Sequence, residues 1–133
     1  MIPAAFDYEV AESVDHAIGL LGEREDAKLL AGGHSLLPAM KLRLARPALL
    51  VDVGRLADLS YVREDGGHIV IGALTRHKDV ASAALLREHC PIVSHTAGQV
   101  GDPQVRHRGT IGGSLAYGDP ASDLPTVILA LDG

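Results

Sequence analysis

A glycine-rich stretch in the first third of the chain reads Ala31-Gly32-Gly33-His34-Ser35-Leu36-Leu37-Pro38. A second stretch, called the second glycine loop below, reads Arg108-Gly109-Thr110-Ile111-Gly112-Gly113-Ser114. Glycine lets successive backbone N–H groups point into one concavity and lets a ligand approach the main chain without a Cβ in the way. In each loop a serine follows the glycines. The two loops therefore suit one diphosphate bound by both.

Neither loop matches a standard nucleotide motif. The chain has no Gly-x-Gly-x-x-Gly that opens a helix and no Gly-x-x-x-x-Gly-Lys followed by Ser or Thr, so neither the dinucleotide fingerprint nor a P-loop is predicted. An isolated Gly-Gly pair is usually a tight turn, and this is our interpretation of Gly66-Gly67. The two longer loops differ because each adds a hydroxyl donor.

Composition limits the possible functions. The chain has 133 residues, 47% of them hydrophobic, and fits one domain or two small lobes. The net charge of −5 and the presence of only four aromatic residues give no support to a nucleic-acid partner. No apolar run reaches the length of a membrane span. We therefore expect no nucleic-acid partner and no membrane-spanning segment.

The cysteine and histidine patterns predict no metal site in this chain, and the N-terminus bears on its localisation. Cys90 is the only cysteine and cannot by itself hold an iron–sulfur cluster or zinc. Residues 1–5 show neither a basic segment nor a signal-peptide core, so we expect a cytoplasmic protein. The histidines form no His-x-x-x-His pair, and we expect most of them at the surface. They are His16, His34, His68, His77, His89, His95 and His107.

Hydrophobic spacing predicts an α+β fold, because strands and helices mix without a clean β-α-β alternation. The predicted strands are 6–9, 28–31, 48–53 and a hairpin of 61–64 with 68–72. The predicted helices are 14–21 capped by Ser13, 36–44, a short turn in 55–60, 78–87, 92–100, and 124–131 capped by Asp123. In the 36–44 helix, we expect Met40, Leu42 and Leu44 to be partly buried.

No residue is predicted to be catalytic. The chain lacks a Gly-x-Ser-x-Gly nucleophile elbow, so a nucleophilic role for Ser35 or Ser114 is not indicated. Asp119 is expected to start a proline turn, while Asp123 has two readings: a helix cap, or an acceptor for a ribose hydroxyl or a flavin-like ring. His34 is either a hydrogen-bonding spacer in its loop or an attachment point for a flavin.

Long motifs give the chain a resemblance to a known family. Residues 30–47 resemble the first FAD loop of the flavin-binding (medium) subunits of the aerobic carbon monoxide dehydrogenase group, in the xanthine oxidase family of molybdenum hydroxylases. Residues 105–114 resemble their second loop. Residues 71–75 and 120–125 match in order and spacing, so that the resemblance covers almost the whole chain.

The resemblance implies a two-lobed FAD-binding domain of the p-cresol methylhydroxylase (PCMH) and vanillyl-alcohol-oxidase type. Residues 1–53 would form the first lobe and 54–133 an incomplete second lobe, with the family's C-terminal domain absent. The apolar pattern of 126–131 stops at the end of the sequence, so we expect a fragment. By position, the implied FAD contacts are Ala31, Gly32, Gly33, His34, Ser35, Val100, Thr110, Ile111, Gly112, Gly113, Ser114 and Asp123.

The same resemblance implies an electron-transfer role rather than substrate chemistry. A large subunit with a molybdenum cofactor would oxidise the substrate, and a small subunit with two [2Fe–2S] clusters would pass electrons to FAD, which reduces an external acceptor. Two alternatives stay open. One is a self-contained flavoprotein oxidase with FAD linked to His34, and the other is a truncated fragment that does not bind flavin.

Overall fold

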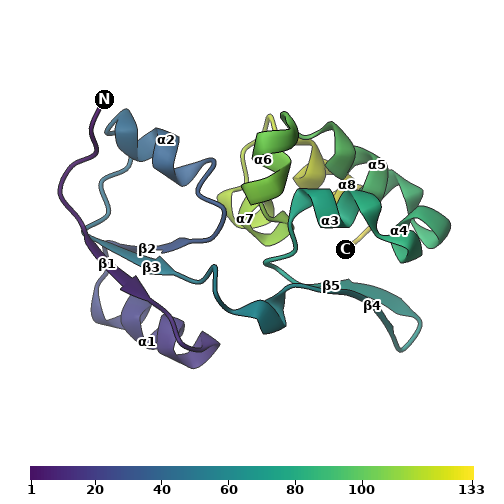
Figure 1. Cartoon of the computed structure of the whole chain (residues 1–133), viewed down its shortest axis with the longest axis horizontal. Helices are drawn as coiled ribbons and strands as arrows, with labels where there is room; N and C mark the ends of the chain where they lie inside the picture. Colours follow the sequence, from purple (N-terminus) through teal and green to yellow (C-terminus); the bar gives the residue numbers. More distant parts are fainter. The chain divides into compact units, whose positions relative to one another are not determined.

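The computed structural model describes residues 1–133 and divides into two compact units, Met1–Ala57 and Asp58–Gly133 (Figure 1). The family resemblance predicts a boundary between Val53 and Gly54. The observed division falls at the short 3-10 helix η1 (Ala57–Leu59), inside the segment where a turn of helix is predicted.

A parallel sheet organises the first unit. Its strands β1 (Asp7–Val10), β2 (Ala27–Leu30) and β3 (Leu49–Asp52) lie in the order β1-β3-β2. The connections contain α1 (Val14–Glu23) and α2 (Leu36–Lys41), which lie on opposite sides of the sheet (Figure 1). Right-handed crossovers require this arrangement, because the second connection returns across the sheet in the opposite direction to the first.

The strand β3 is buried, which accounts for its apolar sequence. Leu49, Leu50 and Val51 are at most 3% exposed, as expected for the central strand of a parallel sheet with helices on both faces. Strand and helix alternate strictly in this unit, contrary to the pattern expected from the sequence. The α+β class itself is confirmed, since the second unit combines an antiparallel hairpin with a group of helices.

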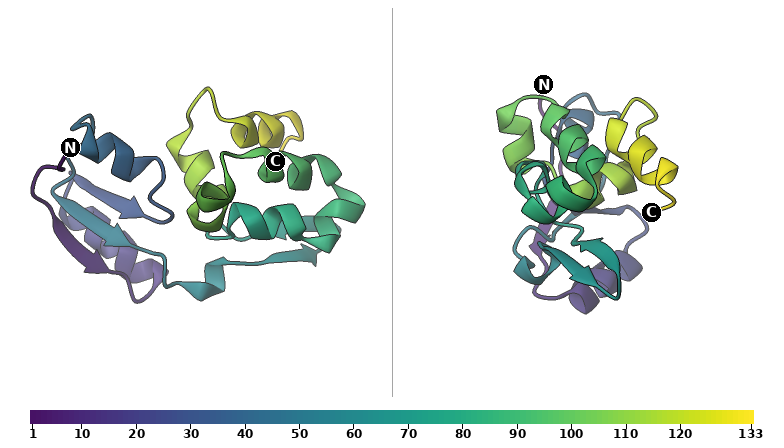
Figure 2. Two further views of the ribbon diagram at one scale, coloured as in Figure 1. Left: turned by 45° about the horizontal axis from the view of Figure 1, so that its top comes forward. Right: turned by 90° about the vertical axis from the view of Figure 1, so that its right-hand side faces the viewer.

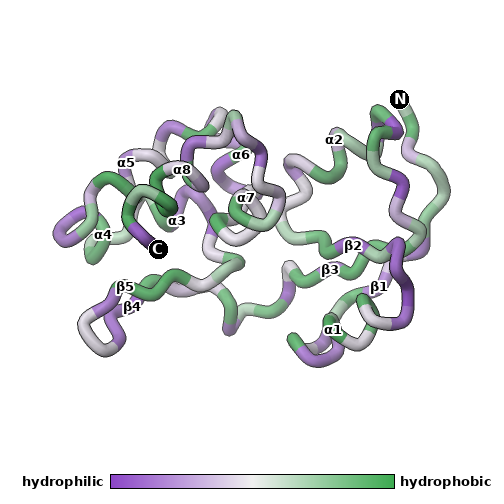
Figure 3. Tube along the Cα trace, turned by 180° about the vertical axis from the view of Figure 1, so that it is seen from behind, coloured by the Kyte–Doolittle hydropathy of each residue, from purple (hydrophilic) through white to green (hydrophobic).

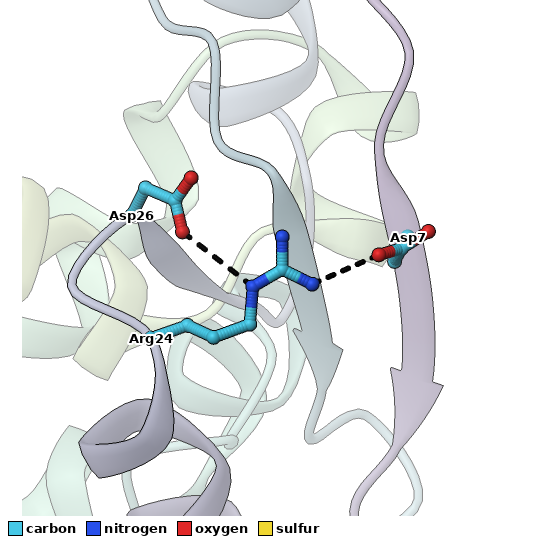
Figure 4. Close-up of polar contacts among 3 residues, drawn as sticks. All are labelled: Asp7, Arg24 and Asp26. Carbon is cyan, nitrogen blue, oxygen red and sulfur yellow. Dashed lines mark hydrogen bonds and ion pairs between the residues drawn. The ribbon is translucent and has the colours of Figure 1, made fainter.

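Exposed charges tie the outer strand β1 to the turn before β2. The Arg24 guanidinium lies 2.8 Å from an Asp7 carboxylate oxygen and 3.6 Å from one of Asp26 (Figure 4). The hydrogen bond to Asp7 raises the pKa of Arg24 further. Because these side chains are exposed, the ion pairs favour this geometry without adding much stability.

The second unit begins with a hairpin of β4 (Val62–Asp65) and β5 (His68–Ile71). Gly66 and Gly67 have φ values of +57° and +80°, which confirms the predicted tight turn. The turn end of the hairpin is hydrophilic (Figure 3), whereas Val62, Ile69 and Ile71 pack against the apolar core of the unit.

Helices form the rest of the second unit and lie on one side of the hairpin (Figure 1 and Figure 2). Their core consists of Val80, Leu86, Val93, Ala97, Ile111 and Leu124, all at most 3% exposed. The helices are α3 (His77–Ser82), α4 (Ala84–His89), α5 (Pro91–Gln99), α6 (Pro103–Arg108), α7 (Ile111–Tyr117) and α8 (Asp123–Ala130).

Two predicted helices have different limits in the structure. The helix predicted over 78–87 is two helices, because Ala83 adopts extended backbone angles (φ −63°, ψ 116°) between α3 and α4. The helix predicted over 36–44 ends at Lys41, and Arg43 takes a left-handed φ of +58°. Leu42 and Leu44 are therefore 57% and 81% exposed rather than partly buried.

Two further predictions about helix ends are wrong. Ser122, not Asp123, is the N-cap of α8, and Asp123 is the first helical residue. The second glycine loop is also not a loop along its length. Gly112, Gly113 and Ser114 lie in the first turn of α7, whose N-cap is Thr110.

Candidate functional site

The first glycine loop connects the end of β2 to the start of α2. Gly33 has a φ of +78°, a conformation that glycine adopts without strain. The backbone N–H groups of Gly33, His34 and Ser35 donate to no other group of the chain, while the Gly33 and Ser35 carbonyls accept bonds from α2. Successive amides are thus open to an external acceptor, as an anion-binding loop requires.

His34 is exposed at the surface of this loop. Its Nδ1 lies 3.1 Å from the Gly32 carbonyl oxygen, so Nδ1 carries the proton and donates to it. The other ring nitrogen, Nε2, makes no bond within the chain. This geometry fits both interpretations of His34, as a spacer that shapes the loop and as an exposed imidazole nitrogen.

The amides of the second glycine loop are used inside the protein. Gly113 donates to the Thr110 hydroxyl, which caps the helix, and Ser114 donates to the Thr110 carbonyl. The other two amides pair with the segment 73–77: Ile111 donates to Thr75 O at 3.0 Å and Gly112 to Ala73 O at 2.9 Å. The interpretation that these glycines turn free amides toward a ligand is therefore wrong.

Close packing is the reason for glycine in this segment. A Cβ on Gly112 would lie 2.6 Å from the Ala73 carbonyl oxygen, and one on Gly113 would lie 2.7 Å from the Thr110 hydroxyl. A Cβ on Gly109 would lie 2.7 Å from the ring of His77. Glycine allows the start of α7 to lie directly on the segment 73–77, which orients Ser114.

His77 is a residue that sequence reasoning missed. It is 2% exposed, an exception among histidines of which most are expected at the surface, and burial lowers its pKa. Its backbone N–H donates to the Gly109 carbonyl at 3.0 Å, and its Nε2 lies 3.3 Å from the Ser114 hydroxyl oxygen. Nδ1 has no hydrogen-bond partner. The sequence signal was slight: His77 follows the short motif 71–75.

The remaining predicted contacts belong to the second unit. Val100 caps the C-terminus of α5 and is half-buried, and its carbonyl accepts a bond from Arg106 at 3.1 Å. Asp123 is exposed in the first turn of α8, and its carboxylate makes no bond within the chain. Because α8 packs against both α5 and α7, these residues and Ser114 share one group of helices.

The turn before α8 has the predicted geometry. Asp119 Oδ1 accepts the Ala121 N–H at 2.9 Å, which confirms the predicted proline turn. No set of three or more His, Cys, Asp or Glu side chains lies close enough together to hold a metal ion. None of the helices has the length and apolar character needed to cross a membrane.

Comparison with known proteins identifies the family. The family model described as "FAD binding domain in molybdopterin dehydrogenase" matches residues 4–133. The chain belongs to this family. FAD is accordingly its cofactor, and the open amides of residues 33–35 fit the diphosphate of that molecule.

Characterised relatives agree with this assignment. The chain is 49% identical over 133 residues to the 6-hydroxypseudooxynicotine dehydrogenase complex subunit alpha of Paenarthrobacter nicotinovorans, covering 99% of this chain and 45% of that protein. It is 47% identical to the carbon monoxide dehydrogenase medium chain of Hydrogenophaga pseudoflava, covering 99% of this chain and 46% of that one. The chain thus spans about half the length of the curated relatives it matches.

Solved structures confirm the fold. A carbon monoxide dehydrogenase from Hydrogenophaga pseudoflava that lacks the Mo-pyranopterin moiety of its cofactor matches with a TM-score of 0.94 and 49% identity, covering 98% of this chain and 46% of that chain. The cyanide-inactivated Cu,Mo-CO dehydrogenase matches with a TM-score of 0.96 and 45% identity, at the same coverage of both chains. The resemblance to the carbon monoxide dehydrogenase medium subunits is confirmed.

Proposed function

We propose that the chain is the FAD-binding part of an electron-transferring medium subunit in a molybdenum hydroxylase of the carbon monoxide dehydrogenase type. The observation that supports this most directly is the first glycine loop, where three successive amides donate to nothing in the chain. An FAD diphosphate supplies the acceptor oxygens for such amides. The activity of the whole protein is part of this proposal, because the relatives are about twice as long.

Most of the proposed FAD contacts have a role that follows from their chemistry and position. Residues 31–35 bind the diphosphate through their amides, with Ser35 offering a hydroxyl. In the second unit, Ser114 offers a hydroxyl and Asp123 an exposed carboxylate that accepts from a ribose hydroxyl or the ring system. Thr110 and Ile111, at most 3% exposed, support the second glycine loop, and Gly112, Gly113 and Val100 complete the proposed set.

FAD, when bound, accepts electrons from one-electron carriers and delivers them in pairs. The chain itself binds and orients the cofactor and needs no acid or base of its own. We propose that electrons arrive from a small subunit with two [2Fe–2S] clusters, that a large molybdenum subunit oxidises the substrate, and that an external acceptor takes the electrons. The names of the relatives support a shared assembly, since they are a "medium chain" and a "complex subunit".

A flavin assay tests the core of this proposal. The purified protein should show flavin absorbance bands, and acid precipitation should release FAD into the supernatant and leave a colourless pellet. A purified, folded protein that takes up no FAD when the cofactor is added would contradict the proposal and favour a fragment that does not bind flavin.

A second candidate function is a self-contained oxidase with FAD attached to His34. The observation that favours it is the exposed ring of His34, whose Nε2 has no partner within the chain. Here the pellet from acid precipitation should stay yellow, and His34→Ala should release the flavin. The same experiment therefore separates the two candidates.

A further inference from the structure

The second glycine loop is held by a segment outside the glycine motifs. Residues 73–77 pair with residues 109–112 in an antiparallel manner, and the Arg76 side chain bonds the Arg108 carbonyl. This pairing fixes the point at which α7 begins. The position of the Ser114 hydroxyl is therefore determined by the segment 73–77 as much as by α7 itself.

His77 lies at the end of this pairing, beneath the second glycine loop. The residue is 2% exposed, and its ring packs against Gly109 and approaches the Ser114 hydroxyl oxygen at 3.3 Å through Nε2. The other nitrogen, Nδ1, is buried without a partner. Burying an unpartnered polar atom costs stability that an apolar side chain of similar size would not cost. The contact with Ser114 is thus the interaction that distinguishes histidine from leucine here.

We propose that His77 is a positioning residue for cofactor binding. Its Nε2–H donates to the Ser114 hydroxyl oxygen and so directs the hydroxyl hydrogen of Ser114 toward a phosphate oxygen of FAD. This inference rests on the proposed function, because it takes Ser114 as an FAD contact.

The hydrogen-bonding capacity of the two side chains supports this direction. A serine hydroxyl has one donor and two acceptor sites, so Ser114 can accept from His77 and donate to a phosphate at the same time. With the proton on Nε2, the buried Nδ1 carries only a lone pair and leaves no N–H without an acceptor. The opposite tautomer would bury an N–H without an acceptor and would direct the Ser114 hydrogen into the ring. Burial also lowers the pKa of His77, in agreement with a neutral ring.

Titration of the FAD-depleted protein with FAD tests the coupling of the two residues. His77→Leu and Ser114→Ala should each weaken FAD binding about tenfold, the loss of roughly one hydrogen bond to a charged group. The double variant should bind no more weakly than either single variant, because both remove the same interaction. His77→Gln, which carries an amide N–H at the distance of Nε2, should recover most of the affinity. The exposed His95→Leu serves as the control and should bind like the wild type.

Several outcomes would overturn the inference. The inference would be overturned if the double variant bound FAD about a hundredfold more weakly than the wild type, because the two effects would then be independent. It would also be overturned if His77→Gln bound FAD as weakly as His77→Leu. If His77→Leu does not fold, His77→Asn replaces it, since its shorter amide does not reach Ser114.

A second ligand separates this inference from the proposed function. Riboflavin carries no phosphate, so Ser114→Ala should leave its binding unchanged while weakening that of FAD. Tight FAD binding by Ser114→Ala would overturn only the proposed role of His77 and Ser114 in FAD binding. Absence of FAD binding in the wild type would instead contradict the proposed function.

Discussion

At the scale of single residues, glycine serves two different purposes in the two loops. Gly33 is required for its backbone angle, since its φ is +78° and the nearest atoms to an added Cβ belong to the flexible Leu37 side chain. Gly112 has no left-handed φ, and an added Cβ would meet the Ala73 backbone. The same residue type therefore exposes amides in the first loop and permits close packing in the second.

Replacing Gly33 should affect FAD binding more than stability. Gly33→Ala places a Cβ at a left-handed φ, which costs about 1–2 kcal/mol and favours a rearranged loop with misdirected amides. We expect a fall in bound FAD, measured by absorbance after purification. Gly67→Ala is the matched control, because it carries the same kind of strain (φ +80°) in open space at the hairpin turn. It should lower the Tm similarly and keep its FAD, and equal FAD loss in both variants would argue against the first loop as the binding site.

Replacing His34 should weaken FAD binding without abolishing it. The ring donates to the Gly32 carbonyl and so shapes the loop, but the amides that bind the diphosphate belong to the backbone. His34→Ala should therefore retain FAD at a higher Kd, measured by fluorescence titration. Complete loss of flavin in this variant, together with a yellow acid pellet from the wild type, would favour covalent attachment.

The buried ring of His77 should make stability depend on pH. Its pKa is lowered in the folded state, so the unfolded chain binds the proton first as the pH falls below about 6.5, the ordinary histidine value. Stability from this group is full above that pH and declines below it. Unfolding measured in urea between pH 7 and 5.5 should show a shallower decline for His77→Gln, while the exposed His95→Gln should follow the wild type. Identical slopes in all three proteins would contradict the prediction.

At the scale of elements, α7 is a short helix whose start is set by tertiary contacts. The Thr110 cap and the bonds to Thr75 and Ala73 fix its first turn, although Gly112 and Gly113 lower its intrinsic helix propensity. Tertiary pairing therefore overrides helix propensity. This explains why the sequence predicts a loop for this segment, whereas the structure has a helix.

Replacing Gly112 should destabilise the second unit itself. A Cβ there would lie 2.6 Å from Ala73 atoms, so α7 must move away from the segment 73–77. Gly112→Ala is expected to lower stability by about 1–3 kcal/mol, as overpacking does. Gly98→Ala in α5 is the matched control, since the nearest atom to its Cβ lies 3.8 Å away. It should hold or raise the Tm by removing a helical glycine, and a stable Gly112→Ala variant would contradict the packing argument.

At the scale of the whole molecule, the chain has the fold of a family described as an FAD-binding domain. Cys90 is the only cysteine, no metal-binding cluster is present, and no catalytic group has been identified. Under the proposed function, the electrons for FAD would come from partner subunits, in keeping with relatives that are named a "medium chain" and a "complex subunit".

The protein is therefore expected to purify with two other kinds of subunit. Mild affinity purification followed by size-exclusion chromatography should give one peak that contains FAD, iron and molybdenum. A protein that runs as a lone monomer and oxidises an organic substrate without iron or molybdenum would contradict the electron-transfer role.

Local patterns in the sequence determined much of this protein. The Gly66-Gly67 hairpin turn, the buried strand at 49–52, the Ser13 cap and the first glycine loop were all predictable, because short-range chemistry decides them. The long motifs also identified the family and its cofactor. Direct FAD contact by the individual residues stays a prediction.

Only the tertiary structure decided how the second glycine loop is used. Its amides pair with residues 73–77 across more than thirty positions of sequence, the left-handed Arg43 ends α2 early, and His77 is buried beneath Gly109. Each of these depends on a partner remote in sequence or on how the chain folds back on itself. Spacing and composition carry no record of such partners, because hydrogen bonds and van der Waals contacts act across space and not along the chain.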